Sequence, residues 1–498
     1  MQKINWNEWN KETFQKAAKE NKPILLDIHG VWCHWCHVME QTSYSDPEII
    51  EIVNKDFIPI KVDTDKGPAI NKRYNQGGWP STVFLTPTGQ IITGTTYIPP
   101  DSLKDMMFRV IDTFKDIKFQ EVVSEGKKLI IDNNIKLDNK IIEKIMEDML
   151  NNFDFDYGGF GVPKFPMTDA INLVFDQYLK IKNNNSLNKN KSINEKDLLI
   201  IARLTLDNMK GIFDNIEGGF YRYSVTQQWN EPHYEKMMET NAGIIQNYLQ
   251  GYEIMKKDEY KDIAIKSLNY IKNNLSNKDG AFYGSQDADE EYYPKNLEER
   301  KKHGKPFIDK NIYTDLSSMM ISTYIYAYKI LKDDFYKNFA VKSIKFLIDK
   351  SYDEKFGMFH FYDSKRKFLP GMLLDNVYFI KALIDVFEIT KDKLYINTAV
   401  KLNKFVINNF MGKDKCFFDK VSNPEDIGFL KFRDKLLIEN SIVAINLIKL
   451  SKINNNKEYL KIAENILKAF YSEYEKYSVH GAIYGLAVEM FLELKANK

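Results

Sequence analysis

The distribution of apolar residues over the first hundred positions predicts alternating strands and helices. Apolar runs that begin at residue 24 and span residues 57–63 and 82–86 have the composition of strands, and a turn at residues 87–89 leads to a short strand over 90–93. Residues 101–114 carry apolar side chains at helical spacing behind a capping aspartate. This part of the chain is therefore expected to be an α/β domain.

A glycine-aromatic turn marker recurs through the rest of the chain. Its aromatic or apolar residue stands at positions 160, 220, 282, 359, 418 and 484, in steps of 60, 62, 77, 59 and 66 residues. Each step accommodates two helices and their loops, and residues 244–255 and 373–387 show apolar faces at helical spacing. Six helical hairpins can close into an (α/α)6 toroid around a central funnel. An open solenoid is the alternative, but its last unit would normally be polar, and residues 487–494 are apolar.

The two patterns together predict a multi-domain chain, α/β followed by all-α. We expect a first domain over residues 1–118, a linker over 119–137 and the helical toroid over 138–498. Residues 183–196 are polar and are expected to form a loop, because they cannot bury enough apolar surface to offset the entropy of ordering.

Charge and hydropathy exclude several classes of function. The net charge of +1 and the pI near 7.6 give no electrostatic reason to expect nucleic acid or an anionic membrane as a partner. The N-terminus has no apolar signal region, and no run reaches the roughly 18 apolar residues of a membrane span. Only three cysteines occur, and Cys416 stands apart between aromatic neighbours, where a buried free thiol is expected. We therefore expect a cytoplasmic protein from a reducing compartment.

The most informative motif is Cys33-His34-Trp35-Cys36, which follows the first strand directly. A helix is expected to begin at Cys33, where the helix dipole and unpaired N–H groups lower the pKa of a thiol. Cys36 stands three residues later and can close a disulfide. Asp27, six residues before Cys33, is held inside the sheet and can serve as a proton donor or acceptor for Cys36. The motif therefore predicts thiol–disulfide chemistry.

The same residues resemble thioredoxin-fold proteins position by position. The resemblance implies that Asp27 is the buried acid, Cys33 the nucleophile and Cys36 the resolving cysteine. It also implies that Pro80 is the cis-proline next to the disulfide. Trp79, Pro80 and Ser81 then become the expected substrate contacts.

Metal binding is the main alternative for this motif. Cys33, His34, Cys36 and His37 offer four donors, but Cys-x-x-Cys is half of a structural zinc site and no second pair follows at suitable spacing. The strand context favours redox chemistry, and no metal and no cofactor are expected. A protonated His34 would stabilise the thiolate of Cys33 and make the pair a better oxidant.

Several longer motifs extend the resemblance over nearly the entire chain. They are residues 33–39, 77–80, 158–166, 218–225, 232–237 and 285–289. Together they are similar to the spermatogenesis-associated thioredoxin-like family. That resemblance implies a thioredoxin-like domain fused to a six-hairpin toroid similar to glycosidases and N-acylglucosamine 2-epimerases.

The toroid departs from the family pattern at three places. Thr240, Leu316-Ser317-Ser318 and Leu374-Asp375-Asn376 replace carboxylate, indole and amide groups, which weakens the case for sugar chemistry. The remaining acid–base candidates for a pocket at the toroid mouth are Arg222, Tyr223, His233, Glu235, Asp287 and Asp289. Acidic residues in turns more often cap helices or form ion pairs with neighbouring loops, so a structural role is the stronger expectation.

We therefore expect a thiol–disulfide oxidoreductase-like protein whose toroid binds a partner or ligand. The substrate is expected to be a protein or small-molecule disulfide or thiol, and the toroid is a candidate site for a saccharide-like ligand. Two alternatives remain: a carbohydrate-active epimerase or hydrolase with a regulatory thioredoxin-like domain, and a non-catalytic binding scaffold.

Overall fold

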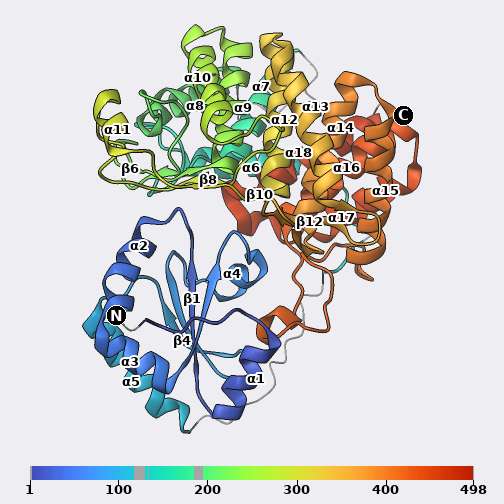
Figure 1. Ribbon diagram of the computed structural model, residues 1–498. Helices are drawn as coiled ribbons and strands as arrows, with labels where there is room; N and C mark the ends of the chain where they lie inside the picture. The colour runs from blue at the N-terminus through green and yellow to red at the C-terminus, as the bar shows by residue number, and fades with distance from the viewer. Residues whose placement is uncertain (1–2, 117–128, 133, 184–193, 497–498) are drawn as a thin grey trace. The chain divides into compact units, whose positions relative to one another are not determined.

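The computed structural model describes residues 3–116, 129–132, 134–183 and 194–496 of the chain. The chain divides into two compact units (Figure 1). The first comprises Met1–Gly126 and Ser422–Asp434, and the second comprises Lys127–Val421 and Lys435–Lys498. The expected linker over residues 119–137 lies partly outside the described residues.

The first unit is a four-stranded sheet covered by helices on both faces. Strand β1 is parallel to β2 and antiparallel to β3, which pairs with β4, so the order is β2-β1-β3-β4. The strands are β1 (Ile24–His29), β2 (Ile58–Asp63), β3 (Ser81–Leu85) and β4 (Ile91–Thr95), and the helices are α1 (Lys11–Glu20), α2 (His34–Gln41), α3 (Pro47–Asp56), α4 (Pro68–Tyr74) and α5 (Pro100–Phe114). The α/β domain predicted from the apolar runs is confirmed.

Strand alternation divides the core of this unit into two layers. Leu25 packs with Met39 of α2 and Leu103 of α5, whereas Leu26 packs on the opposite face with Phe14 of α1 and Tyr74 of α4. Successive side chains of a strand point to opposite faces, so Asp27 and His29 lie on the same face as Leu25. This register places Asp27 on the face that α2 covers.

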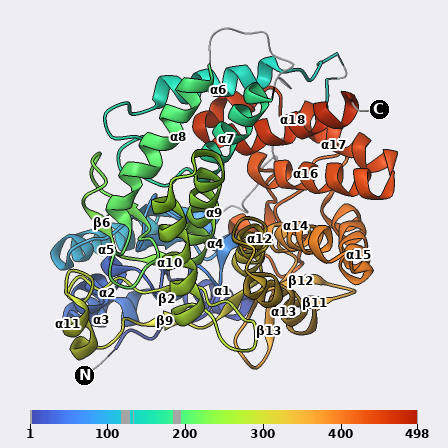
Figure 2. The ribbon, with the colours of Figure 1, turned by 90° about the horizontal axis from the view of Figure 1, so that it is seen from above.

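The second unit is a ring of helical hairpins. Each inner helix contacts the next, and α18 contacts α7, so the ring is closed (Figure 2). The inner helices are α7 (Thr168–Lys182), α9 (Met238–Met255), α12 (Thr314–Leu331), α14 (Leu373–Thr390), α16 (Leu437–Asn454) and α18 (Ala482–Ala496). The outer helices are α6 (Lys140–Asn152), α8 (Glu195–Met209), α10 (Asp258–Asn274), α13 (Asp334–Lys350), α15 (Lys393–Phe410) and α17 (Lys457–Ala469). The predicted toroid is confirmed, and the solenoid alternative is wrong.

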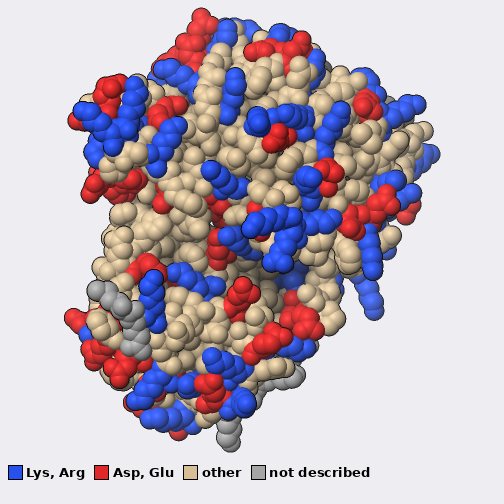
Figure 3. Space-filling view, viewed as in Figure 1, with Lys and Arg blue, Asp and Glu red and all other residues tan. Residues whose placement is uncertain are grey.

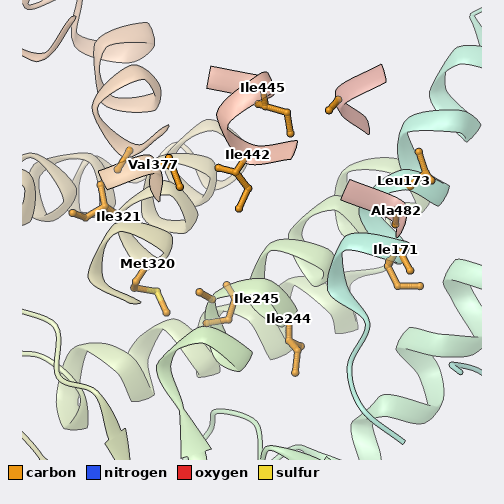
Figure 4. Packing of buried hydrophobic residues seen from close by; sticks show 14 of the residues in the cluster. Ile171, Leu173, Ile244, Ile245, Met320, Ile321, Val377, Ile442, Ile445 and Ala482 are labelled. Atoms are coloured by element: carbon orange, nitrogen blue, oxygen red, sulfur yellow. The ribbon is translucent and has the colours of Figure 1, made fainter. Parts of the chain in front are cut away.

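The inner helices are apolar over most of their circumference because they are covered from both sides. Side chains such as Ile171, Ile245, Ile321, Val377 and Ile442 of successive inner helices form a continuous core (Figure 4). A helix that is apolar all round is stable only when it is buried in this way.

Short strands and one small helix occupy the loops that lead into the inner helices. They are β5 (Tyr223–Ser224), β6 (Pro232–His233), β7 (Lys236–Met237), β8 (Ser285–Gln286), β9 (Ile308–Asp309), β10 (Ile312–Tyr313), β11 (Tyr352–Asp353), β12 (Gly357–Tyr362) and β13 (Lys367–Pro370), with helix α11 (Leu297–His303). All of these loops run from the C-terminal end of an outer helix to the N-terminal end of an inner one.

The glycine-aromatic markers form antiparallel bridges behind five outer helices. Phe153 pairs with Phe160, Phe213 with Phe220, Ser276 with Phe282, Tyr352 with Met358 and Met411 with Phe417. The equivalent positions in the fourth and fifth repeats are therefore Met358 and Phe417, one residue before the markers at 359 and 418. The sixth marker does not form a turn, because Gly481 ends a 3-10 helix and Ala482 begins α18.

Asparagines in the first turn of three inner helices hold these bridges. The Asn241 side chain accepts a hydrogen bond from Phe220 N at 2.8 Å and donates to Phe220 O at 3.0 Å. Asn440 makes the same pair of contacts with Phe417, and Asn376 accepts from Met358 N at 3.0 Å. The N-termini of α9, α14 and α16 are thereby fixed to the turns that precede them.

A segment between α15 and α16 belongs to the first unit. Ile427 and Phe429 pack against the core layer of Leu26 and Tyr74, and Phe429 N donates to the Tyr74 hydroxyl at 2.8 Å. A Cβ atom on Gly89 would lie 2.7 Å from Gly428 Cα, so this approach requires glycine. The sequence pattern assigned all of residues 138–498 to the toroid and did not predict that residues 422–434 belong to the first unit.

We predict that Phe429→Ala lowers the stability of the first unit. The substitution removes a partly buried ring from its core, so we expect a loss of about 1–3 kcal/mol in the free energy of unfolding. Five of the six tryptophans (positions 6, 9, 32, 35 and 79) belong to this unit, so urea denaturation followed by tryptophan fluorescence reports on it. Phe108→Ala removes a ring that is 50% exposed and is the control. Equal midpoints for the two variants would contradict the prediction.

Candidate functional site

The two cysteines of the motif form a disulfide at the start of α2. Cys33 is the N-cap residue, and its Sγ accepts a hydrogen bond from the backbone N–H of Cys36 at 3.1 Å. Both cysteines are buried, at 4% and 8% exposure. The helix N-terminus therefore acts directly on the sulfur of Cys33.

The proline loop lies beside the cysteine loop. The Trp79-Pro80 peptide bond is cis, as the resemblance implies. Trp79 and Trp32, which directly precede Pro80 and Cys33, pack edge to face with ring centroids 5.4 Å apart. Ser81 is fully buried and its hydroxyl donates to Gly78 O at 2.7 Å, and Pro80 is buried as well. Among the three expected substrate contacts, the side chain of Trp79 is the one that is partly exposed.

Asp27 is buried close to the positive charge of Lys61. Lys61 Nζ lies 3.7 Å from Asp27 Oδ2, and the Tyr44 hydroxyl donates to Asp27 Oδ1 at 3.4 Å. Burial raises the pKa of Asp27 to about 7, although Lys61 acts in the opposite direction. A carboxyl with this pKa can accept and return a proton near neutral pH.

His29 is a further titratable group near Asp27, with Nδ1 3.7 Å from Asp27 Oδ2. Burial and the charge of Lys61 lower the pKa of His29 to about 3, so its imidazole is neutral at physiological pH. His29 therefore adds no positive charge to the site.

Four of the six predicted pocket residues of the toroid come together. The ring of Tyr223 stacks on His233 with centroids 4.5 Å apart, and the Arg222 guanidinium lies 5.8 Å from the centroid of the Tyr223 ring. His233 Nδ1 lies 3.5 Å from Glu235 Oε1. Strands β5 and β6 produce this arrangement by pairing Tyr223 with His233.

The other two predicted residues lie in the loop after β8. Asp289 accepts hydrogen bonds from Glu291 N and Tyr292 N and lies 3.2 Å from His303 Nε2. The backbone N–H of Asp287 donates to Phe307 O at 2.8 Å. Asp289 thus organises its own loop.

A cavity of about 570 Å³ lies between the inner helices. Asp169 and Glu239 line it at the N-terminal ends of α7 and α9, and Lys329 and Lys449 line it in the C-terminal halves of α12 and α16. Tyr378 and Lys381 line it from the first half of α14. Isoleucine, leucine and methionine side chains supply the apolar part of the wall. None of the six predicted pocket residues is among the described residues that line this cavity.

Acidic groups surround Tyr378 at one end of the cavity. Burial raises the pKa of Tyr378 far above its ordinary value, and the charges of Asp169, Glu239, Asp315 and Glu439 raise it further. Burial also raises the pKa values of Asp169 and Glu239. Sequence reasoning missed these acids, although each occupies the second or third position of an inner helix. Glu239 stands two residues before Asn241, and Glu439 stands one residue before Asn440.

A further acidic group involves a histidine. His360 Nδ1 lies 2.9 Å from Asp375 Oδ1 and 3.1 Å from Asp375 Oδ2, and both residues are buried. Asp315 lies beside them, and its pKa is raised to about 7 by burial and by the charge of Asp375. Asp315 and His360 were not predicted as site residues.

The comparison with protein families identifies the first unit. Residues 1–140 match the model of the family Thioredox_DsbH, described as a protein of unknown function, DUF255. The first unit is a thioredoxin-like domain. Human spermatogenesis-associated protein 20 is 30% identical over 335 residues, which are 61% of this chain and 41% of that protein. Protein B0495.5 of Caenorhabditis elegans is 33% identical over 57% of this chain and 41% of its own length. The expected resemblance is confirmed, and the matched part spans about two fifths of these relatives.

Redox proteins match the thioredoxin-like unit over shorter stretches. The thiol:disulfide interchange protein DsbD of Pseudomonas fluorescens is 31% identical over 87 residues, which are 16% of this chain and 15% of that protein.

Solved structures confirm the fold of the second unit. A cellobiose 2-epimerase from Spirochaeta thermophila superposes with a TM-score of 0.56 at 10% identity, covering 72% of this chain and 95% of that chain. A cellobiose 2-epimerase from Bacillus thermoamylovorans gives a TM-score of 0.53 at 13% identity, covering 68% and 85%. At such identities the likeness shows the (α/α)6 fold alone. Among the described helices, none is long and apolar enough to span a bilayer.

We predict that Asp27→Asn changes how stability depends on pH. Because the folded-state pKa of Asp27 is raised to about 7, its stabilising contribution is complete below the unfolded pKa and is lost as the pH rises through 7. The variant should therefore gain roughly 2–4 kcal/mol relative to the parent between pH 4 and pH 8. Urea denaturation followed by tryptophan fluorescence measures this difference. Asp105→Asn, at an exposed aspartate of α5, is the control. A constant difference across this range would contradict the burial argument.

Proposed function

We propose that the thioredoxin-like unit carries out thiol–disulfide exchange. The observation that supports this most strongly is the Cys33–Cys36 disulfide at the N-terminus of α2, with the cis-proline loop beside it. The DsbD match and the raised pKa of Asp27 agree with this function.

The reaction follows from the order of the two cysteines. The Cys33 thiolate attacks one sulfur of a substrate disulfide, which forms a mixed disulfide and releases the other sulfur as a thiolate. Cys36 then transfers its proton to the Asp27 carboxylate and attacks Cys33 Sγ. The second substrate sulfur leaves as a thiolate and takes the proton back from the Asp27 carboxyl, and two electrons have passed from the cysteine pair to the substrate. A thiol donor must reduce Cys33–Cys36 before the next cycle, and an excess of reduced dithiol substrate over the Cys33–Cys36 disulfide drives the same steps in reverse.

The surface around the disulfide is suited to an extended or apolar partner. Trp35 lies inside the motif, is 45% exposed and packs against Tyr97 with ring centroids 5.1 Å apart. Trp79 adds a second partly exposed indole beside Trp32. Exposed aromatic groups with little conformational entropy are effective anchors for a partner. We assign substrate contact to Trp79 and Pro80, together with the backbone of Ser81.

We infer that the protein works in a reducing cytoplasm. The sequence contains only three cysteines, and Cys416 is fully buried, with a pKa that burial raises to about 12. Both basic and acidic side chains lie on the face shown in Figure 3. The net charge of +1 is the reason for not expecting nucleic acid as a partner.

We predict that the reduced cysteines differ sharply in reactivity. Cys33 should be alkylated at mildly acidic pH, because the helix N-terminus lowers its pKa below the ~8.5 of a free thiol, whereas Cys36 should react slowly. Cys33→Ser should abolish reduction of insulin disulfides, and Cys36→Ala should trap partners as mixed disulfides that mass spectrometry identifies. Cys416→Ser is the matched control and should retain activity. Equal, slow labelling of Cys33 and Cys36 would contradict the assignment of the nucleophile.

A second candidate function concerns the toroid. The cavity combines carboxyl groups, lysines and an apolar wall, which is the composition of a small-ligand site, and its fold is that of cellobiose 2-epimerases. We propose that the cavity binds a saccharide-like ligand. This ligand would contact Asp169 and Glu239, which line the cavity, rather than the six residues predicted from the sequence, which do not.

We predict that a reducing sugar binds in the cavity and that Asp169→Asn weakens its binding at least ~10-fold, through loss of a charged hydrogen-bond acceptor. Isothermal titration with glucose, mannose, N-acetylglucosamine and cellobiose tests this. Asp262→Asn makes the same change at an exposed aspartate of α10 and should have no effect. If none of these sugars binds at millimolar concentration, the toroid is better described as a scaffold.

A further inference from the structure

Three side chains with metal-ligating groups meet at the N-terminal ends of two inner helices. Asp315 lies in the first turn of α12, Asp375 lies in the first turn of α14, and His360 projects from β12. One donor atom of each residue lies within 4.8 Å of the donor atoms of the other two. Within the described ranges, no other group of three His, Cys, Asp or Glu side chains meets this condition.

The group contains two carboxyl groups in a poorly solvated place. Asp375 is 0% exposed and His360 is 5% exposed. Over the part of the chain that the structure describes, no Lys or Arg lies within 4.0 Å of the Asp315 or Asp375 carboxyl, and the ion-pair partner of Asp375 is His360. When both carboxyls are ionised, a proton on the imidazole balances one negative charge and leaves the other, which is costly where little water reaches. A divalent cation beside a neutral imidazole balances both carboxylates.

We propose that Asp315, His360 and Asp375 form a binding site for a divalent metal ion of the zinc or manganese class. One imidazole nitrogen with two carboxylate oxygens is a donor set that suits these ions. Calcium requires six to eight oxygen donors, and magnesium prefers oxygen ligands and water, so neither fits this set as well.

The spacing is compatible with coordination. Donors bound to one zinc ion at about 2.1 Å are separated from each other by roughly 3–3.5 Å. His360 Nδ1 and Asp375 Oδ1 are already 2.9 Å apart, and the ion would take the place of the proton between them. Asp315 is only partly buried, so a small rotation of its side chain can complete the set.

The site lies next to the cavity of the toroid. Asp315 is near enough to Tyr378 for its charge to act on the Tyr378 hydroxyl, and Tyr378 lines the cavity. Three protein ligands leave at least one coordination position for water or for an oxygen atom of a ligand. The proposal adds a metal site to the toroid and does not depend on the redox function of the first unit.

The test is direct metal titration of the full chain with its Cys33–Cys36 disulfide intact, because reduced cysteines would also bind zinc. After treatment with EDTA and dialysis, isothermal titration with zinc chloride, and separately with manganese chloride, should reveal one site per chain for at least one of the two ions. His360→Ala and Asp315→Asn should each weaken binding at least ~100-fold, because each removes a ligand. Cobalt substitution should give the visible d–d absorption of a protein-bound ion in the parent and not in these variants.

The control is Asp262→Asn, which makes the same change at an exposed aspartate of α10 that is none of the three ligands and should leave metal affinity within about twofold of the parent. Asp315→Asn is isosteric at a partly exposed position, and circular dichroism with EDTA present establishes that the variants are folded. Absence of a site for both ions in the parent would overturn the proposal and leave the three residues as an ion-pair group. Binding that survives both His360→Ala and Asp315→Asn would overturn it equally.

Discussion

The contact on which the toroid's candidate sites depend is the clamp between an inner-helix asparagine and the preceding glycine-aromatic turn. Asn241, Asn376 and Asn440 satisfy backbone groups that would otherwise be buried without partners, which makes each clamp costly to lose. The same contacts fix where α9, α14 and α16 begin. Acidic residues one or two positions before an asparagine, such as Asp375 and Glu239, are therefore held at one end of the ring rather than distributed along it.

Local signals explain how much of the architecture could be predicted. The apolar strands, the helix after Cys33 and the cis-proline loop depend on short-range patterns, and the repeat of the turn markers reflects the same helical unit used again. The turn predicted at the sixth marker is absent, because glycine followed by an apolar residue is also compatible with the start of a helix, as at Gly481. That the segment 422–434 belongs to the first unit could not be predicted from its sequence. Its apolar side chains, such as Ile427, are buried only when the segment packs against the core of a domain that lies about 300 residues earlier in the chain.

The toroid acids were missed for a different reason. Comparison with the family pattern drew attention to the positions occupied by Thr240, Leu316 and Leu374, where polar groups are lost. Carboxylates stand one residue away from these positions, at Glu239, Asp315 and Asp375. A shift of one residue rotates a side chain around the helix axis, so the sequence alone does not say whether the carboxylate still lies near the cavity. The nearness of His360 to Asp375 could not be predicted, because it depends on how β12 lies against α14 after the ring has closed.

The insertion of residues 422–434 into the first unit has a consequence for the order of events during synthesis. The first 126 residues contain the whole sheet and the cysteine pair, but Ile427 and Phe429 are part of one of its core layers. At about 5–20 residues per second, a ribosome needs roughly 15–60 s to proceed from residue 126 to residue 434. During that interval the nascent thioredoxin-like unit presents an apolar face, and the Tyr74 hydroxyl keeps its hydrogen bond to Gly89 O but lacks the one from Phe429 N. Completion of this unit is therefore tied to translation of most of the toroid.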